Sequence, residues 1–214
     1  MDARDPIISA MSDISAGAQD TSLSLDLALT IRHDGHGGVA DDLDRPEALT
    51  AWVRERAGAL PDAAGFEADA TALAEVREVR AAVRALFAHA VRPAAPSPAD
   101  ADRLLPVSEA VRRLNAAAAL APTVPVLTWA EGAAPLVRHE ARTAAPAPDL
   151  LTAALARAAV AFLASEDRER LRSCHAPRCV RYFLKDHPRQ EWCKPSCGNR
   201  ARVARHHERH RAEA

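Results

Sequence analysis

The sequence predicts a mainly helical α+β protein, in which a helical N-terminal domain is followed by a small cysteine-rich module with a short β-hairpin and a basic helix. Three observations point to this fold class. The chain is 48% hydrophobic but only 4% aromatic, and cores of alanine, leucine and valine suit closely packed helices. Apolar residues recur at helical spacing over 67–91. All four cysteines lie beyond residue 173.

The first residues are polar and low in large apolar groups, which predicts a disordered leader over 1–21. The mostly helical domain then covers 22–172, and the cysteine-rich module covers 173–211. The segment just after the leader fits two structures. Its apolar residues alternate as in a strand, yet Leu23, Leu27 and Ile31 also share one helical face, so the pattern leaves both interpretations open.

The clearest helix is expected over 67–91, where apolar and charged residues separate onto two faces. The predicted buried stripe comprises Leu73, Val76, Val79, Val83, Leu86 and Phe87. The predicted solvent-facing side comprises Glu75, Arg77, Glu78, Arg80 and Arg84.

Other elements of this domain follow from local signals. A short helix is expected to begin at Pro46, because proline is favoured at the first helical position. Helical periodicity continues over 107–120, and 124–129 with 136–140 are expected to form a β-hairpin around a turn that contains glycine. A long helix is expected over 149–172, running directly into the first cysteine.

The cysteines form two close pairs. Four residues separate Cys174 from Cys179, thirteen separate Cys179 from Cys193, and three separate Cys193 from Cys197. Four thiolates on two tight turns can close a tetrahedron around one zinc ion. Such a site has no open coordination position, so the spacing predicts a structural zinc site with these four residues as ligands and no catalytic role.

The zinc module is too small to fold on a hydrophobic core alone, and metal binding is expected to supply its folding energy. Strands are expected at 180–184 and 190–192, paired as a hairpin. Tyr182, Phe183 and Trp192 are expected to cover the metal. Since the module depends on the ion and the helical domain has its own core, the two regions are expected to unfold separately.

Charge is distributed unevenly along the chain. Residues 168–211 carry 13 Lys/Arg against 4 Asp/Glu, whereas the rest carries 15 against 25. A zinc ion bound by four thiolates contributes about −2, which leaves the module strongly cationic. The natural partner of such a surface is a polyanion, with nucleic acid preferred over an anionic membrane.

The N-terminus lacks the basic and apolar regions of a signal peptide, and no uninterrupted apolar run reaches the ~18–20 residues that span a bilayer. A cytoplasmic protein without membrane contact is therefore expected. Because cytoplasmic thiols stay reduced, this setting favours metal binding over disulfides.

A polar helix is expected after the last cysteine, with nucleic-acid contacts from Arg200, Arg202, Arg205 and Arg209. The last three lie on one face, and guanidinium groups suit phosphates and guanine edges. Gly198 is expected to take a positive φ, and Asn199 or Ser196 to cap the helix.

The run Cys193-x-x-x-Cys197-Gly198-Asn199-Arg200, with a tryptophan before Cys193 and a cysteine pair upstream, resembles the CGNR zinc finger. The leucine-rich 23–30 segment, the helix start at Pro46 and the helical body resemble the ABATE domain, a stress-induced transcription-regulator domain. The resemblance implies a bacterial, DNA-binding transcription regulator with the four cysteines as zinc ligands.

Two other functions stay open. The finger could bind RNA or another protein, and the helical domain could bind a small-molecule effector or form a homodimer. An enzyme could use His33, Asp34 and His36 in the glycine-rich loop 33–38. No phosphate loop, nucleophile elbow or dinucleotide motif accompanies them, so the sequence predicts a protein that is not an enzyme.

Overall fold

The computed structural model describes residues 16–36, 38–60, 62–100 and 104–212. Residues 1–15, most of the predicted leader, lie outside this range. The end of the predicted leader is helical, because helix α1 begins at Ala16 and runs to Leu29. The ambiguous segment that starts at Leu23 is therefore a helix, and Leu23 and Leu27 are buried on one face of it.

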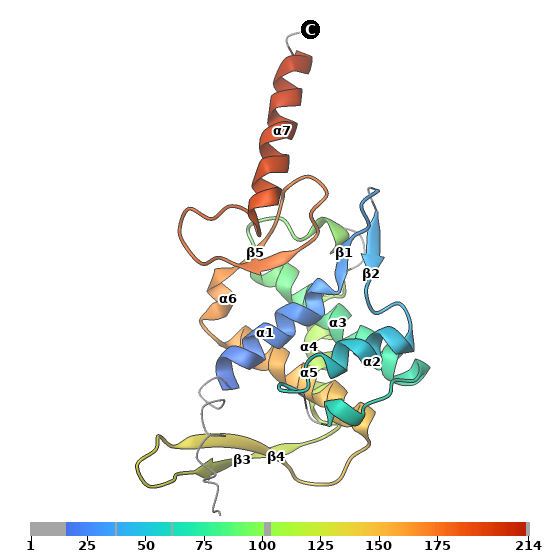
Figure 1. Ribbon diagram of the computed structural model, residues 1–214, viewed down its shortest axis with the longest axis vertical. Coiled ribbons are helices and arrows are strands. Elements are labelled where there is room, and N and C mark those ends of the chain that lie inside the picture. The colour runs from blue at the N-terminus through green and yellow to red at the C-terminus, as the bar shows by residue number, and fades with distance from the viewer. Residues whose placement is uncertain (1–15, 37, 61, 101–103, 213–214) are drawn as a thin grey trace, which may run out of the picture.

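Five helices build the core, and the mainly helical α+β class is confirmed (Figure 1). Helix α3 packs against α1, α2, α4 and α5, while α5 also packs against α1 and α4. The helices are α1 (Ala16–Leu29), α2 (Pro46–Arg54), α3 (Ala70–Ala90), α4 (Val107–Ala118) and α5 (Ala147–Ala164). Two short 3-10 helices lie at Ala63–Gly65 and Pro98–Asp100.

Helix α3 confirms the predicted apolar stripe, all of which is buried. The Asp69 side chain caps its start by accepting a hydrogen bond from the Ala72 backbone nitrogen at 2.7 Å. The predicted solvent-facing side is wrong in one respect. Arg80 and Arg84 are only 6% and 5% exposed.

Both arginines enter the core because each meets a carboxylate there. Arg80 binds Asp41 through two nitrogens at 2.5 and 2.6 Å, and Arg84 binds Asp100 at 2.7 and 3.0 Å. Burial by itself raises the pKa of Asp41, but the hydrogen bond and charge of Arg80 bring it below its usual value. Removing one partner of such a pair would leave an uncompensated buried charge, which costs about 3–5 kcal/mol.

Two antiparallel hairpins extend from the helical body. Strands β1 (Ile31–His33) and β2 (Val39–Asp41) enclose the glycine-rich loop. Strands β3 (Thr123–Thr128) and β4 (Leu136–Ala141) confirm the predicted hairpin. The β3–β4 hairpin lies at the end of the body away from helix α7 (Figure 1).

Helix α5 ends at Ala164, well before the predicted end near residue 172. Its 18 residues have a mean hydropathy of 1.5, so within the described part of the chain it alone has the length and composition of a membrane span. Arg157 interrupts its apolar sequence, and the helix packs against α1, α3 and α4 in the core.

The cysteine-rich region has a different hairpin from the one predicted. After the short helix α6 (Asp167–Arg170), strand β5 (Leu171–Ser173) pairs with β6 (Tyr182–Leu184). Residues 190–192 form no strand. The predicted return strand was wrong because strand β5, of which Leu171 and Arg172 were assigned to the preceding helix, supplies the partner instead. Helix α7 (Pro195–Ala212) ends the described chain.

Tyr182 joins the cysteine-rich region to the helical body, contrary to the expectation that it covers the metal. Its ring lies 5.5 Å from that of Phe87 in the body's core, and its hydroxyl donates to Asp100 Oδ2 at 2.7 Å. Burial, followed by the Asp100 carboxylate, raises the pKa of Tyr182. Ser97 Oγ adds a hydrogen bond to the Val180 carbonyl at 2.8 Å. The two regions thus share a core, which argues against separate unfolding.

Replacing Tyr182 with phenylalanine tests this joint. The ring stays in place, but Asp100 loses a buried donor, so the free energy of unfolding should fall by about 1–3 kcal/mol in urea titrations. Phe183→Leu, a change in the neighbouring residue that packs on the cysteines, serves as control. It should affect metal retention more than body stability. Unchanged stability of Tyr182→Phe would contradict a joint made through this hydroxyl.

Candidate metal centre and basic helix

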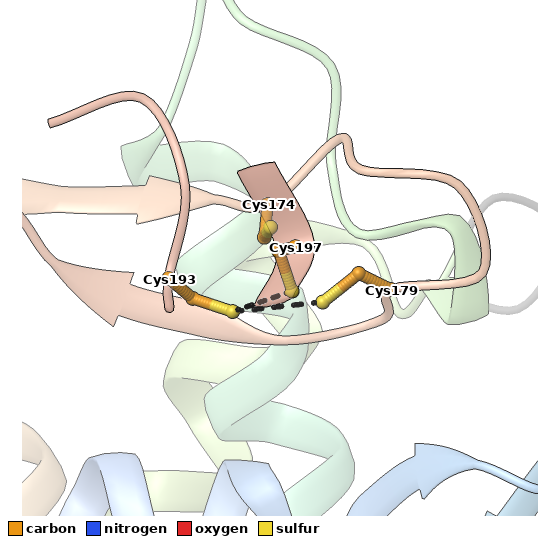
Figure 2. A group of neighbouring side chains, drawn as sticks. All are labelled: Cys174, Cys179, Cys193 and Cys197. Atoms are coloured by element: carbon orange, nitrogen blue, oxygen red, sulfur yellow. Dashed lines mark hydrogen bonds between the residues drawn. The ribbon is translucent and has the colours of Figure 1, made fainter. Parts of the chain in front are cut away.

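The four cysteine sulfurs converge on one point (Figure 2). All lie within 4.8 Å of one another, with Cys179 Sγ 3.7 Å from Cys193 Sγ and Cys193 Sγ 3.5 Å from Cys197 Sγ. A zinc tetrahedron with bonds of about 2.3 Å has sulfur–sulfur edges of about 3.8 Å. The spacing of the sulfurs therefore fits one zinc ion.

Three chain segments position these sulfurs. Cys174 follows strand β5, and its backbone nitrogen donates to the Arg181 carbonyl at 2.9 Å. A tight turn brings Cys179 back, with its nitrogen donating to the Ala176 carbonyl at 2.9 Å. Cys193 precedes helix α7, and Cys197 lies in the first turn of that helix. Metal binding would therefore tie the start of α7 to the β5–β6 hairpin.

The four thiols lie so close together that a cation is needed before all of them can ionise. Hydrogen bonds from Cys179 and then Cys193 lower the pKa of Cys174 to about 2. The hydrogen bond with Cys174 in turn raises the pKa of Cys179 to about 11, and the hydrogen bond between Cys174 and Cys193 raises the pKa of Cys193. Without a cation, four sulfurs at this spacing cannot all be ionised. A divalent ion removes this repulsion, since a coordinating thiol is deprotonated outright.

Apolar side chains and one arginine surround the sulfurs. Phe183 packs against the buried cysteines and Trp192 lies half-buried beside them, as predicted. Arg200 donates from its guanidinium to Cys197 Sγ at 3.1 Å. Such a contact suits a thiolate, because a charged donor and a charged acceptor strengthen each other.

Gly198 has a role that the sequence analysis missed. It lies inside helix α7 and not at a positive φ, and a Cβ atom there would be 3.0 Å from Trp192 Cδ1. The glycine thus lets the Trp192 ring approach the helix closely. Asn199 also lies within the helix, where its side chain accepts a hydrogen bond from Arg202 and does not cap the helix start.

Helix α7 projects away from the rest of the molecule (Figure 1). Arg202, Arg205 and Arg209 line one side of it, together with Glu208. Val203, the one large apolar residue on this part of the helix, is 56% exposed. Ala201 is buried at the base of the helix, and beyond it every described residue up to Arg211 is exposed except the half-buried Ala204.

The loop residues His33, Asp34 and His36 do not gather into a site. Asp34 Oδ1 accepts hydrogen bonds from the backbone nitrogens of His36 and Gly38 at 2.7 and 2.9 Å. The first of these bonds chiefly lowers the pKa of Asp34. Within the described ranges, the four cysteines are the only group of three or more His, Cys, Asp or Glu placed to hold a metal.

Comparison with known families agrees with this geometry. Residues 21–166 match the family ABATE, described as "Putative stress-induced transcription regulator", and residues 170–210 match the CGNR zinc finger. Both families, in this order, are those that the sequence resembles. A search of curated proteins found no match. The cysteine cluster lies within the zinc-finger match, so the metal that it suits is zinc.

Substitution of Gly198 by alanine tests the contact with Trp192. The added methyl group would push the indole away, and overpacking of this kind costs about 1–3 kcal/mol. We expect a lower melting temperature and faster loss of zinc to a chelator. Gly58→Ala is the control, because a methyl group added there would meet no atom within 4 Å. Equal zinc loss in the two variants would contradict the assigned role.

Proposed function

The chain belongs to the ABATE family and carries a CGNR zinc finger after the ABATE domain, and we propose that it regulates transcription by binding duplex DNA through helix α7. The observation that carries this proposal is the projecting cationic helix anchored at one end by the cysteine cluster. It acts by binding and not by catalysis, in the cytoplasm.

We assign the zinc ligands to Cys174, Cys179, Cys193 and Cys197. Four thiolates leave no coordination position for substrate, so the ion has a structural role. Its effect is to fix the first turn of α7 relative to the β5–β6 hairpin, which Tyr182 in turn fixes to the body. Zinc thereby sets the direction in which α7 leaves the molecule.

The dimensions and charge of α7 suit the major groove. Its 18 residues span about 27 Å, and the groove admits one α-helix. Arg202, Arg205 and Arg209 face solvent and supply the contacts to phosphates or guanine edges. Arg200, grouped with them in the sequence analysis, is directed to the Cys197 sulfur, so its main role lies in the metal cluster.

The helical body is the proposed regulatory part, as a binding site for a small-molecule effector or a surface for homodimer formation. The second candidate function is a finger that binds RNA or a protein. The exposed arginines of α7 would serve RNA as well as DNA, so competition between duplex DNA and RNA of equal length separates the two.

The zinc assignment predicts about one ion per chain, measured by elemental analysis of the intact protein. Cys193→Ser should lose most of the zinc, because it removes one ligand. Ser196→Ala, an exposed neighbour, should keep it. Because Tyr182 couples the finger to the body, chelation should also lower the melting temperature of the helical domain. Disulfides in a cytoplasmic preparation, or a helical domain unaffected by chelation, would contradict this account.

The helix assignment predicts a change in salt dependence. Each arginine that neutralises a phosphate releases about one counterion, so the slope of log affinity against log salt should change by ~0.9 for each of Arg202, Arg205 and Arg209 replaced by glutamine. An arginine that binds a guanine instead should cost ~1–3 kcal/mol when removed.

A matched variant with Arg92, Arg112 and Arg142 replaced by glutamine loses the same charge from exposed positions of the body. Its slope should stay near that of the wild type. Equal affinities and slopes for the two triple variants would overturn the proposed contact face and favour a protein-binding finger.

A further inference from the structure

A basic pocket lies where the β1–β2 hairpin meets the zinc finger. We call it the junction pocket, and its volume is about 390 Å³. The hairpin contributes Arg32 and His33 to its lining. The finger contributes Arg178, Arg181, Lys194 and Arg200. Five cations therefore face one small space from both parts of the chain, and one carboxylate, that of Asp42, lies among them.

Two of these cations already have partners. Arg32 pairs with Asp42, and Arg200 donates to Cys197 Sγ. Within the described part of the chain, Arg178, Arg181 and Lys194 pair with no carboxylate. Like charges brought together without an anion repel one another, which the fold tolerates only at a cost in stability. An anion in the pocket would remove that cost.

The backbone at Arg178 adds an independent observation. Its φ is 62°, in the left-handed region where glycine or asparagine would cost less. The turn that delivers Cys179 therefore does not need an arginine for its own geometry. Arg181 is half-buried as a residue, and its charge has no carboxylate partner among the described residues.

His33 borders the pocket with an unsatisfied donor. Its Nδ1 accepts a hydrogen bond from the Gly35 backbone nitrogen at 2.8 Å, which places the proton of the neutral ring on Nε2. That Nε2 is buried and has no hydrogen-bond partner among the described residues. His33 therefore brings a buried polar atom without a partner to the edge of the pocket.

We propose that the junction pocket binds a phosphate group. A phosphate carries up to two charges and several strong acceptor oxygens, which suits a space lined by cationic residues from both the hairpin and the finger. A carboxylate would satisfy fewer of them. Two sources share this chemistry: a backbone phosphate of nucleic acid bound by α7, and a free phosphate or phosphorylated small molecule. Only the first source rests on the proposed function.

The test uses full-length, zinc-loaded protein and two double variants of equal charge. The junction variant carries Arg178→Gln and Arg181→Gln, and the control variant carries Arg92→Gln and Arg189→Gln, both at exposed positions outside the pocket. Zinc content verifies that each variant is folded. If the junction variant loses zinc, the single change Lys194→Gln replaces it, with Arg189→Gln as its control.

The first arm titrates inorganic phosphate at constant ionic strength and follows thermal unfolding, because a ligand that binds the folded state raises the melting temperature. The second arm measures affinity for duplex DNA over a range of salt concentrations. A free phosphate ligand should bind about tenfold more weakly to the junction variant than to the control variant. A DNA backbone phosphate should instead give a weaker duplex affinity and a salt slope smaller by ~0.9 for each phosphate that is no longer neutralised.

An effect of the junction variant in either arm supports the pocket and identifies its source. Identical behaviour of the junction and control variants in both arms overturns it. The outcomes separate this inference from the proposed function. DNA binding that depends on α7, with no effect of the junction variant in either arm, would overturn only the inference, whereas phosphate binding by a protein that does not bind duplex DNA would overturn only the proposed function.

Discussion

Four sulfurs held within 4.8 Å of one another impose the constraint on which the zinc finger, residues 170–210, depends. Unless a cation lies among them, only part of the set can ionise, as the opposite pKa shifts of Cys174 and Cys179 show. A zinc ion bound by the four cysteines, as proposed, would remove this repulsion and supply folding energy to a segment too short to bury a core of its own. The turn at Arg178, the close contact of Gly198 with Trp192 and the start of α7 all meet at this point.

A second buried polar network connects the zinc finger to the helical body. Arg84 binds Asp100, and Asp100 accepts a hydrogen bond from the Tyr182 hydroxyl, so a charge on α3 is linked through two contacts to a strand of the finger. The Tyr182 ring also packs against Phe87. A buried network of this kind is favourable only while every member is satisfied. A change in how α3 packs would therefore reach the finger through specific hydrogen bonds, which gives the body a physical means of influencing α7.

Local signals made much of the fold predictable from the sequence. The apolar stripe of α3, the β3–β4 hairpin and the cysteine cluster each follow from a period or spacing within one segment. The wrong predictions concern residues whose structure is decided by contacts with other segments of the chain. Arg84 is buried because Asp100 lies beside it in space, which helical periodicity cannot show. Strand β6 pairs with β5, whose first two residues were assigned to a helix. Gly198 is needed for the close contact with the Trp192 ring and not for a turn.

The exposed part of α7 combines two unfavourable features that a polyanion would offset together. Beyond Ala201 the described helix is exposed except for the half-buried Ala204, and isolated helices of this length are marginal in water. Arg202, Arg205 and Arg209 also stand three and four residues apart, where like charges destabilise a helix. Cations in the last turn favour the helix dipole, which compensates only in part. Binding of phosphates along this face would remove the repulsion and order the helix in one step, so the affinity of α7 for a polyanion and its helicity should be coupled.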